Sequence, residues 1–143
     1  MKLKFKKLSD LAQLPEYATS GAAALDVRSI EDHRIYPGDA IAIRTGLAVE
    51  VPNGHVLLAF SRSGHGFKHR VSLVNAVGVV DSDYRGELLV GLRNDNDTWF
   101  DVKVGDRIAQ IMVLELPTME PFWTEELSDT DRGESGFGST GQK

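Results

Sequence analysis

The sequence predicts an all-β fold of the sandwich, jelly-roll or barrel type. Short runs in which apolar residues alternate with polar or small ones recur along the chain, as between Ile35 and Ile43, and this is typical of half-buried strands. Turn residues such as Pro37-Gly38-Asp39 separate these runs about every eight to twelve residues, the spacing of β-sandwiches and barrels. Sustained helical periodicity is scarce, and the chain has no internal repeat.

The elements follow from these signals in chain order. Leu3 and Phe5 alternate with lysines, which predicts an edge strand at the N-terminus. Ser9-Asp10 predicts a short capped turn before Pro15. Further strands are predicted around Ile35 and over residues 41–43, 47–51, 55–60, 77–80, 88–92, 102–104 and 108–116.

Two connections have specific predictions. Pro52-Asn53-Gly54 lies between two alternating runs, which predicts a hairpin that pairs residues 47–51 with residues 55–60. Residues 71–77 are expected to contain a second short helical turn.

The composition bounds the organisation and the partners. A chain of 143 residues is expected to form one domain. We place this domain at residues 1–127, followed over residues 128–143 by a mobile tail rich in glycine and polar residues. The formal net charge of −5 provides no general basic surface, so neither nucleic acid nor an anionic membrane is expected as a partner.

Compartment and redox chemistry are also constrained. The chain has no cysteine, which excludes disulfides and thiolate zinc sites. The basic start, Met1–Lys7, is followed by no apolar run, so we expect neither a signal peptide nor a membrane span. These observations predict a soluble, cytoplasmic protein.

A first candidate site lies in the stretch from Phe60 to Gly66, FSRSGHG. Successive N–H groups in such a loop, beside the Arg62 guanidinium and the Ser63 hydroxyl, are suited to a phosphate group. A solvated surface turn is the alternative. His65 and His69 are four residues apart, but the glycines between them argue against a helix, so we expect solvent-exposed histidines rather than a metal pair.

A second candidate is the tail itself. Arg132 and the glycine-rich run that follows it are able to bind phosphate through charge and backbone N–H groups, while Phe137 offers a ring that stacks on a base. The run lacks the lysine and the preceding strand of a P-loop. A disordered C-terminus is the alternative, although the apolar surface of Phe137 favours some cover.

The third candidate is NAVGVVDSDYRGE, from Asn75 to Glu87. Asp81 directly ends an apolar run and leads into Tyr84, and a carboxylate at the mouth of an apolar pocket is able to accept a proton from water. Gly78 allows the backbone to approach a flat ligand closely. Two ordinary turn acids are the alternative for Asp81 and Asp83.

Together these stretches resemble the five motifs of the homotrimeric dUTPase family, in the same order and over nearly the whole chain. Two departures are small: Ser61 stands where many relatives have proline, and Ala24 stands where glycine is commoner. The five matching stretches are GAAALDVRS (21–29), SRSG (61–64), NAVGVVDSDYRGE (75–87), VGDRIAQ (104–110) and RGESGFGSTG (132–141).

The resemblance implies hydrolysis of dUTP to dUMP and diphosphate, which keeps uracil out of DNA and supplies dUMP for thymidylate synthesis. It implies that Asp81 is the base that deprotonates the attacking water. Mg²⁺ would be bound through the triphosphate, with Asp26 contacting the ion indirectly through water. The residues implied in phosphate binding are Arg62, Ser63, Gly64, Gln110, Arg132, Gly138, Ser139 and Thr140.

The resemblance also implies how the nucleoside is read. Asn75 and the backbone at Gly78 and Val79 would bind uracil, Tyr84 would lie against the deoxyribose, and Phe137 would stack over the base. The implied fold is a distorted jelly-roll-like β barrel of the β-clip type. The chain would form a homotrimer in which subunits share the active sites and the tail closes over them.

Two other functions share this fold. The dCTP deaminases carry a catalytic glutamate five residues after the glycine of the third motif, and here that position is Gly91. Some dUTPase-like proteins act as nucleotide-dependent regulators, but the sequence contains no inserted interaction domain, so regulation is at most an added role.

Overall fold

The structure of the protein, a computed structural model, describes residues 1–136. These residues form ten strands and one short helix, α1 (Ser63–His69). The strands are β1 (Lys4–Lys7), β2 (Leu25–Arg28), β3 (His33–Ile35), β4 (Ala40–Glu50), β5 (His55–Phe60), β6 (Val71–Leu73), β7 (Val77–Val80), β8 (Glu87–Asn94), β9 (Phe100–Val102) and β10 (Arg107–Glu115).

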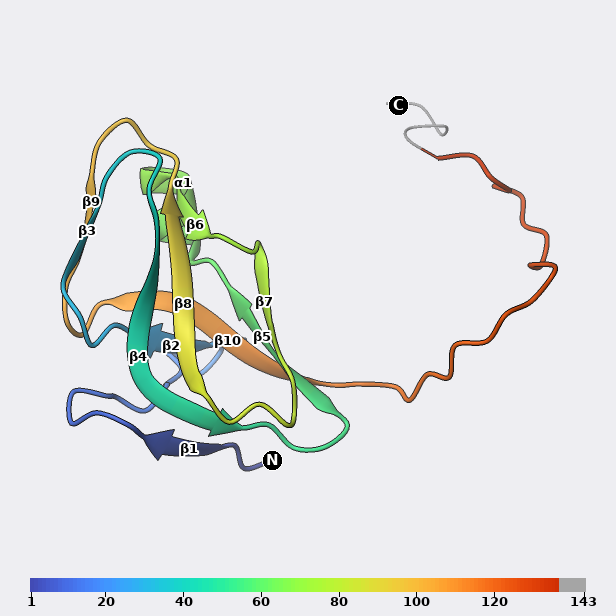
Figure 1. Ribbon diagram of the computed structural model, residues 1–143, viewed down its shortest axis with the longest axis horizontal. Coiled ribbons are helices and arrows are strands. Elements are labelled where there is room, and N and C mark those ends of the chain that lie inside the picture. The colour runs from blue at the N-terminus through green and yellow to red at the C-terminus, as the bar shows by residue number, and fades with distance from the viewer. Residues whose placement is uncertain (137–143) are drawn as a thin grey trace.

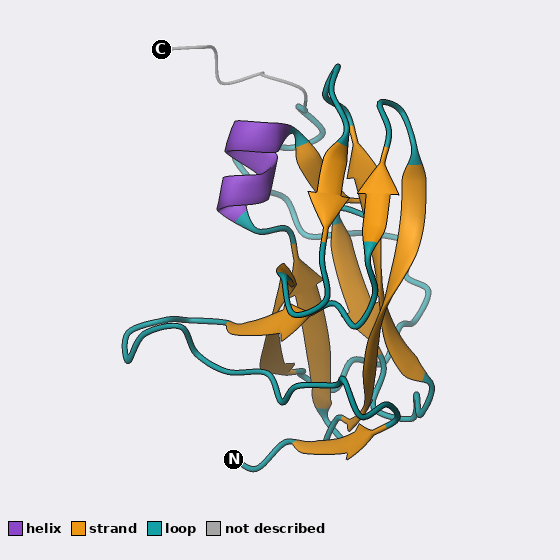
Figure 2. Ribbon diagram, turned by 90° about the vertical axis from the view of Figure 1, so that its left-hand side faces the viewer, coloured by secondary structure: helices purple, strands orange, loops and turns teal. Residues whose placement is uncertain are grey.

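Two four-stranded antiparallel sheets form the body of the molecule (Figure 1). The first sheet has the order β1-β4-β8-β6 and the second has the order β2-β10-β5-β7, while β3 and β9 form a separate ribbon. Buried side chains from both sheets join in one core, among them Ile43, Leu57, Leu92 and Ile111. Figure 2 shows α1 near one end of this strand assembly. The prediction of an all-β, jelly-roll-like fold is confirmed.

Strand β8 illustrates why these residues form strands. Leu88, Val90 and Leu92 are buried, whereas Leu89 and Arg93 are exposed. Successive side chains of a strand point to opposite faces, so this alternation places one face of β8 in the core. The predicted edge strand at the N-terminus is also confirmed, because β1 pairs only with β4, at the margin of its sheet.

The predicted hairpin across Pro52-Asn53-Gly54 is wrong in its pairing. The turn forms, with the His55 N–H bonded to the Pro52 carbonyl at 3.1 Å. However, β4 and β5 then enter different sheets and do not pair with each other. Asn-Gly signals a reversal of the chain, but which strand pairs with which depends on packing between the sheets.

The stretch from Ser63 to His69 is a helix, which corrects the expectation of a loop. The helix ends at Arg70, which has a left-handed conformation with φ 51°. The predicted helical turn over 71–77 is wrong, because its first residues form β6. His69 is exposed as expected, but His65 is half-buried, because its ring packs edge-on against Phe100 of β9 at 5.1 Å.

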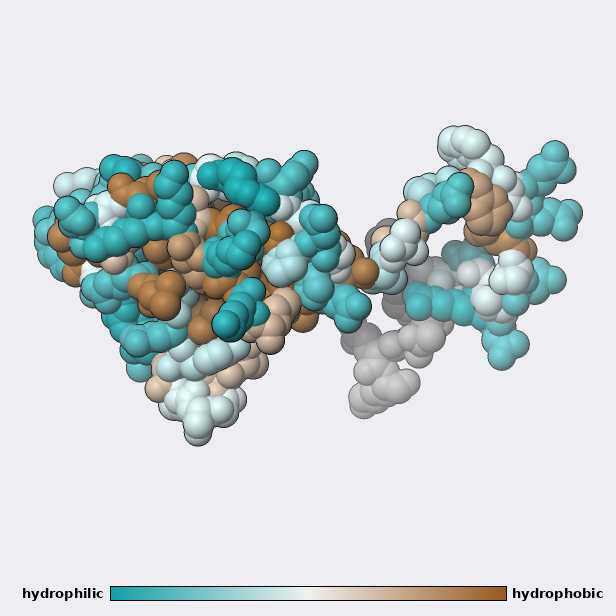
Figure 3. All heavy atoms as spheres, turned by 90° about the horizontal axis from the view of Figure 1, so that it is seen from below, coloured by the Kyte–Doolittle hydropathy of each residue, from teal (hydrophilic) through white to brown (hydrophobic). Residues whose placement is uncertain are grey.

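The chain leaves the body after β10. The Leu116 N–H donates to the Gly54 carbonyl at 2.7 Å, and beyond this bond the segment runs away from the sheets (Figures 1 and 3). Among its large apolar residues, Met119 is 78% exposed and Trp123 is 100% exposed. A single chain therefore leaves this apolar segment uncovered. Within residues 1–136, no helix has the length and apolar character needed to cross a bilayer.

Candidate active site

A groove of about 320 Å³ lies between β7 and β8. It is lined by five of the predicted nucleoside-site and catalytic residues: Asn75, Gly78, Val79, Asp81 and Tyr84. The structure thus brings together the residues of the third motif. Within this motif the chain changes sheets, because β6 belongs to the first sheet and β7 to the second.

Gly78 allows β7 to pair closely with β5. A Cβ atom at this position would lie 3.0 Å from the Ala59 Cβ and 3.6 Å from the Asn75 Nδ2. Gly78 and Ala59 are direct partners in the β5–β7 ladder. The absence of a side chain therefore keeps this strand close to β5 and leaves the Asn75 amide free of a steric neighbour.

The ring of Tyr84 folds back over its own loop. Its hydroxyl donates to the Glu87 carbonyl at 3.0 Å. A Cβ atom at Gly86 would lie 2.6 Å from the Tyr84 Cζ, so only glycine leaves room for the ring there. Gly86 therefore sets the position of Tyr84, although sequence reasoning assigned it no role.

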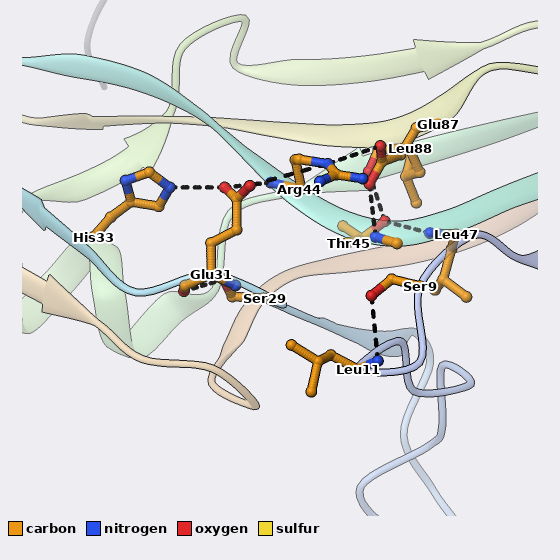
Figure 4. Close-up of polar contacts among 11 residues, drawn as sticks. Ser9, Leu11, Ser29, Glu31, His33, Arg44, Thr45, Leu47, Glu87 and Leu88 are labelled. Carbon is orange, nitrogen blue, oxygen red and sulfur yellow. Dashed lines mark hydrogen bonds and ion pairs between the residues drawn. The ribbon is translucent and has the colours of Figure 1, made fainter.

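Glu87 anchors the end of this loop to β4 (Figure 4). Its carboxylate accepts hydrogen bonds from the Gly46 N–H at 2.8 Å and from the Arg44 Nε at 3.1 Å. The Thr45 hydroxyl donates to the Leu88 carbonyl at 2.6 Å, in the irregular part of the β4–β8 ladder. These bonds fix the loop at the β8 end.

Asp81 is exposed at the end of β7. Its backbone carbonyl accepts the Tyr84 N–H at 3.2 Å, which turns the chain immediately after the carboxylate. Within residues 1–136, the Asp81 side chain has no hydrogen bond or ion pair. A carboxylate in this state is free to bind water or another ligand.

Four of the predicted phosphate residues, Arg62, Ser63, Gly64 and Gln110, lie in a second group around Asp26 of β2. The Asp26 side chain is only 2% exposed and faces two arginines. Its Oδ2 accepts a hydrogen bond from the Arg107 Nη1 at 3.0 Å, and its Oδ1 lies 3.4 Å from the Arg62 Nε. A buried carboxylate between two guanidinium groups holds both in place and offsets the cost of its own burial.

Sheet register places Gln110 beside this cluster. Gln110 of β10 pairs with Asp26 on one side and with Phe60 on the other. Arg62 follows Phe60 directly, and the free N–H groups of Ser63 and Gly64 begin α1 beside it. Arg107 belongs to this cluster too, but sequence reasoning gave it no role, because its pairing with Asp26 spans 81 positions.

Ser61, which stands where many relatives have proline, has a structural role here. Its hydroxyl accepts the Leu73 N–H at 2.8 Å and so ties the end of β6 to the residue that follows β5. A serine therefore restrains this connection through a hydrogen bond where proline would restrain it through its ring.

Within one chain, the groove residues around Asp81 and the arginine cluster around Asp26 do not come together. In the β5–β7 ladder, Phe60 faces Val77 and Leu57 faces Val80. Arg62 follows one end of this ladder and Asp81 follows the other. Continuing the register places Asp81 six positions from Arg62, or roughly 20 Å at the usual rise of a strand. The Asp81 carboxylate and the arginine cluster therefore lie at opposite ends of the same strand pair.

Of the predicted tail residues, only Arg132 lies within the described part of the chain. It sits in a turn, where its Nε donates to the Ser135 carbonyl at 2.9 Å. Phe137, Gly138, Ser139 and Thr140 lie outside the described residues, so their predicted roles stay predictions.

The dUTPase family model matches residues 10–141. The deoxyuridine 5'-triphosphate nucleotidohydrolase of Nautilia profundicola is 47% identical and covers 99% of this chain and 100% of its own. That of Zymomonas mobilis is 43% identical and covers 99% of this chain and 98% of its own.

A solved structure is similar over the same length. The dUTPase of Staphylococcus bacteriophage 80alpha with dUPNHPP has a TM-score of 0.91 and 30% identity, and the match covers 98% of each chain. The family model, the full-length relatives and the shared fold lead to one conclusion: the chain belongs to the dUTPase family.

Proposed function

We propose that this chain hydrolyses dUTP to dUMP and diphosphate, and so limits uracil in DNA and supplies dUMP. The observation that carries the proposal is the exposed Asp81 carboxylate at the mouth of a groove that Asn75 and Tyr84 also line. The names of its relatives specify deoxyuridine 5'-triphosphate as their substrate.

Asp81 acts as the general base in this proposal. It accepts a proton from a water molecule as the water oxygen forms a bond to the α-phosphorus. The bond from that phosphorus to the bridging oxygen breaks, and its electron pair leaves with diphosphate. Little covalent chemistry falls to the protein in such a transfer, so positioning and charge stabilisation provide most of the acceleration.

The arginine cluster binds the phosphate chain. Arg62 and α1 follow Phe60, which pairs with Gln110 in the sheet, and this placement supports a shared role in phosphate binding. Arg107 is added to the residues expected from the sequence, since Asp26 holds it next to Arg62. These groups neutralise a polyanion locally on a chain whose net charge is −5.

Magnesium fits as an ion carried by the substrate. Residues 1–136 contain no cluster of three or more histidine or acidic side chains able to form a metal cage. Mg²⁺ usually keeps several waters and binds through phosphates with one or two carboxylates, and when bound it neutralises triphosphate charge. Asp26 remains the predicted water-mediated contact, but its pairing with Arg62 and Arg107 supports a role in holding these arginines.

The groove reads the nucleoside by hydrogen bonding and shape. Uracil presents a donor at N3 between two acceptors, and we assign the Asn75 amide and the β7 backbone, which line the groove, to match them. Cytosine reverses the pattern at N3 and position 4 and would leave buried groups unpaired, which discriminates by ~10⁴-fold. Tyr84 lies against the deoxyribose and leaves no room for a 2′-hydroxyl.

The active site is shared between copies of the chain in a homotrimer. The roughly 20 Å between the Asp81 end and the Arg62 end of the β5–β7 ladder supports this arrangement, because one chain alone provides only half of each site. The uncovered apolar segment around Trp123 supports self-association as well. Arg132 and the tail residues Phe137, Ser139 and Thr140 then close over the bound nucleotide.

The direct test is to incubate the protein with Mg²⁺ and each of dUTP, dCTP, dTTP and UTP, and to follow diphosphate and ammonia. We expect rapid release of diphosphate from dUTP alone. Release of ammonia from dCTP would indicate a deaminase instead. Gly91 argues against that outcome, because it packs against Val74 in the groove wall and offers no carboxylate.

A further inference from the structure

The guanidinium of Arg62 has a third neighbour besides Asp26 and Arg107. Its Nη1 lies 3.2 Å from the Nε2 of His65 and 3.3 Å from the backbone carbonyl oxygen of Arg107. Its Nε is buried and lies 3.4 Å from the Asp26 Oδ1, in an ion pair that forms no hydrogen bond. The head group is thus held from three directions by β2, β10 and α1.

The contact with His65 defines the state of the imidazole ring. A guanidinium group has only donors, so the Nε2 of His65 must be the acceptor and must carry no proton. The proton of the neutral ring is therefore on Nδ1, which is buried and has no hydrogen-bond partner among residues 1–136, so the contact with Arg62 and not a partner of Nδ1 sets this tautomer. A doubly protonated ring would place a second positive charge against Arg62.

The surroundings of the ring favour the neutral form. Burial lowers the pKa of His65 to about 4, and the charges of Arg62, His69 and Arg107 act in the same direction. Asp106 alone among the nearby charges acts against them. Because α1 packs His65 edge-on against Phe100 at 5.1 Å, the ring cannot turn away freely from the guanidinium.

We propose that His65 is a positioning residue for phosphate binding, acting as a neutral hydrogen-bond acceptor that fixes the Arg62 guanidinium. His65 itself touches no substrate in this proposal. Without the acceptor, Arg62 keeps its charge but loses one of the contacts that set the plane of its head group. The inference depends on the proposed function, in which Arg62 binds the phosphate chain.

The test compares two variants, His65→Leu and His65→Gln. Leucine fills a similar volume without an acceptor, whereas the side-chain oxygen of glutamine can accept from Arg62. We expect His65→Leu to raise the KM for dUTP and the Kd for diphosphate about tenfold, in line with the loss of a charged hydrogen bond. Binding of deoxyuridine, which has no phosphate, should not change. His65→Gln should restore most of the phosphate affinity.

A purely structural role for His65 gives a different result. In that case His65→Leu would lower the melting temperature and weaken deoxyuridine and diphosphate binding alike, and glutamine would not rescue the phosphate affinity. Either finding overturns the inference. If wild-type protein hydrolyses dUTP while His65→Leu is unchanged in every measurement, the inference fails and the proposed function stands.

The tautomer provides an independent measurement on wild-type protein. Long-range ¹H–¹⁵N spectra distinguish a proton on Nδ1 from one on Nε2, and loss of one signal set in a His65 variant assigns the resonance. We expect the Nδ1–H form between pH 6 and 8, since the pKa of His65 is lowered to about 4. A protonated Nε2 at pH 7 would contradict the inference even if neither variant folds.

Discussion

Two carboxylates of the site differ in how strongly their neighbours hold them. Asp26 is buried and paired with Arg62 and Arg107, so its orientation is set by the fold. Asp81 is exposed, and its side chain makes no hydrogen bond or ion pair among the residues that the structure describes. A paired carboxylate orients other groups, whereas a free one is available to react with water, and these are the two roles that we assign.

This difference makes Asp81→Asn a specific test of the catalytic base. Asparagine keeps the shape of the side chain but is not a base, so kcat for dUTP should fall by ~10²-fold or more. Binding of a non-hydrolysable dUTP analogue and the melting temperature should change little, because Asp81 holds no partner in place. Both are measured on the same preparation.

Asp83→Asn is the matched control for that experiment. Asp83 is an exposed acid two residues away and is not among the residues that line the groove. Its substitution should leave kcat near the wild-type value. Normal turnover by Asp81→Asn would show that another group activates the water.

Gly86→Ala tests how Tyr84 selects the sugar. A methyl group at this position occupies the space of the Tyr84 ring, so the ring must move. We expect the ratio of kcat/KM for dUTP to kcat/KM for UTP to fall about tenfold, and the free energy of unfolding to fall by ~1 kcal/mol. Steady-state kinetics and chemical denaturation measure the two effects.

Gly21→Ala is the control, because a Cβ there meets no atom within 4 Å. It should leave the dUTP to UTP ratio unchanged. Should Gly86→Ala also leave that ratio unchanged, Tyr84 does not exclude the 2′-hydroxyl.

At the scale of elements, α1 and β10 show how one segment positions several site residues. The helix holds His65 against Phe100 and presents its first N–H groups beside Arg62. Strand β10 places Gln110 next to Asp26 and provides Arg107 as well. A change in the register of β10 by one residue would point Gln110 to the other face and dismantle the cluster.

The tail is the element whose removal should separate folding from activity. The sheets end at Glu115, and the Arg132 side chain bonds only within its own turn among the described residues. Truncation after Asp131 should therefore leave the melting temperature and the oligomeric state unchanged. Turnover of dUTP should fall by ~10²-fold, because the groups that close over the phosphates are lost.

Deletion of Lys143 alone is the control for this truncation, since it leaves every predicted tail residue in place. Circular dichroism and analytical ultracentrifugation monitor the fold and assembly, and diphosphate release monitors activity. A chain that ends at Asp131 and turns over dUTP at the full rate would rule out a closing role for the tail.

At the scale of the whole molecule, the separation of Asp81 from the arginine cluster leads to a complementation experiment. Arg62→Ala and Asp81→Asn should each be nearly inactive alone. Mixed trimers made by co-refolding equal amounts should regain about a quarter of wild-type activity, because about one shared site in four joins two intact halves. Diphosphate release from dUTP is measured before and after mixing.

A mixture of Arg62→Ala and Gln110→Ala is the matched control. Both substitutions damage the same half of the site, so no mixed trimer contains an intact pair and activity should stay low. Failure of the Arg62→Ala and Asp81→Asn mixture to recover, despite confirmed exchange of subunits, would place the whole site within one chain.

The strand content was largely predictable from local signals, but the pairing of strands was not. Among residues 1–136, no pair of strands is formed by neighbours in the sequence; β4, for example, pairs with β1 and β8. Turn residues report where a chain reverses, whereas partner choice depends on which apolar faces pack together in the core. For that reason the Pro52-Asn53-Gly54 hairpin was wrong although its turn was right.

Local propensity also failed at α1. Two glycines in SGHGFKH lower the intrinsic preference for a helix. The helix forms because His65 and His69 pack against Phe100, which lies 31 or more positions later in the chain. This tertiary contact offsets the low helix preference of the glycines. The same contact buries His65, so the expectation of an exposed histidine and the expectation of a loop failed for one reason.

The sequence by itself determined the all-β class and the family, and it predicted roles for Asp81, Asn75, Tyr84 and Arg62, because each of these depends on motifs of adjacent residues. Only the tertiary structure decided that Asp26 holds Arg62 and Arg107, that His65 faces Arg62, and that Asp81 lies at the far end of the strand pair. These are contacts or separations between segments distant in the chain, and they arise from sheet register and core packing, which no local pattern of residues specifies.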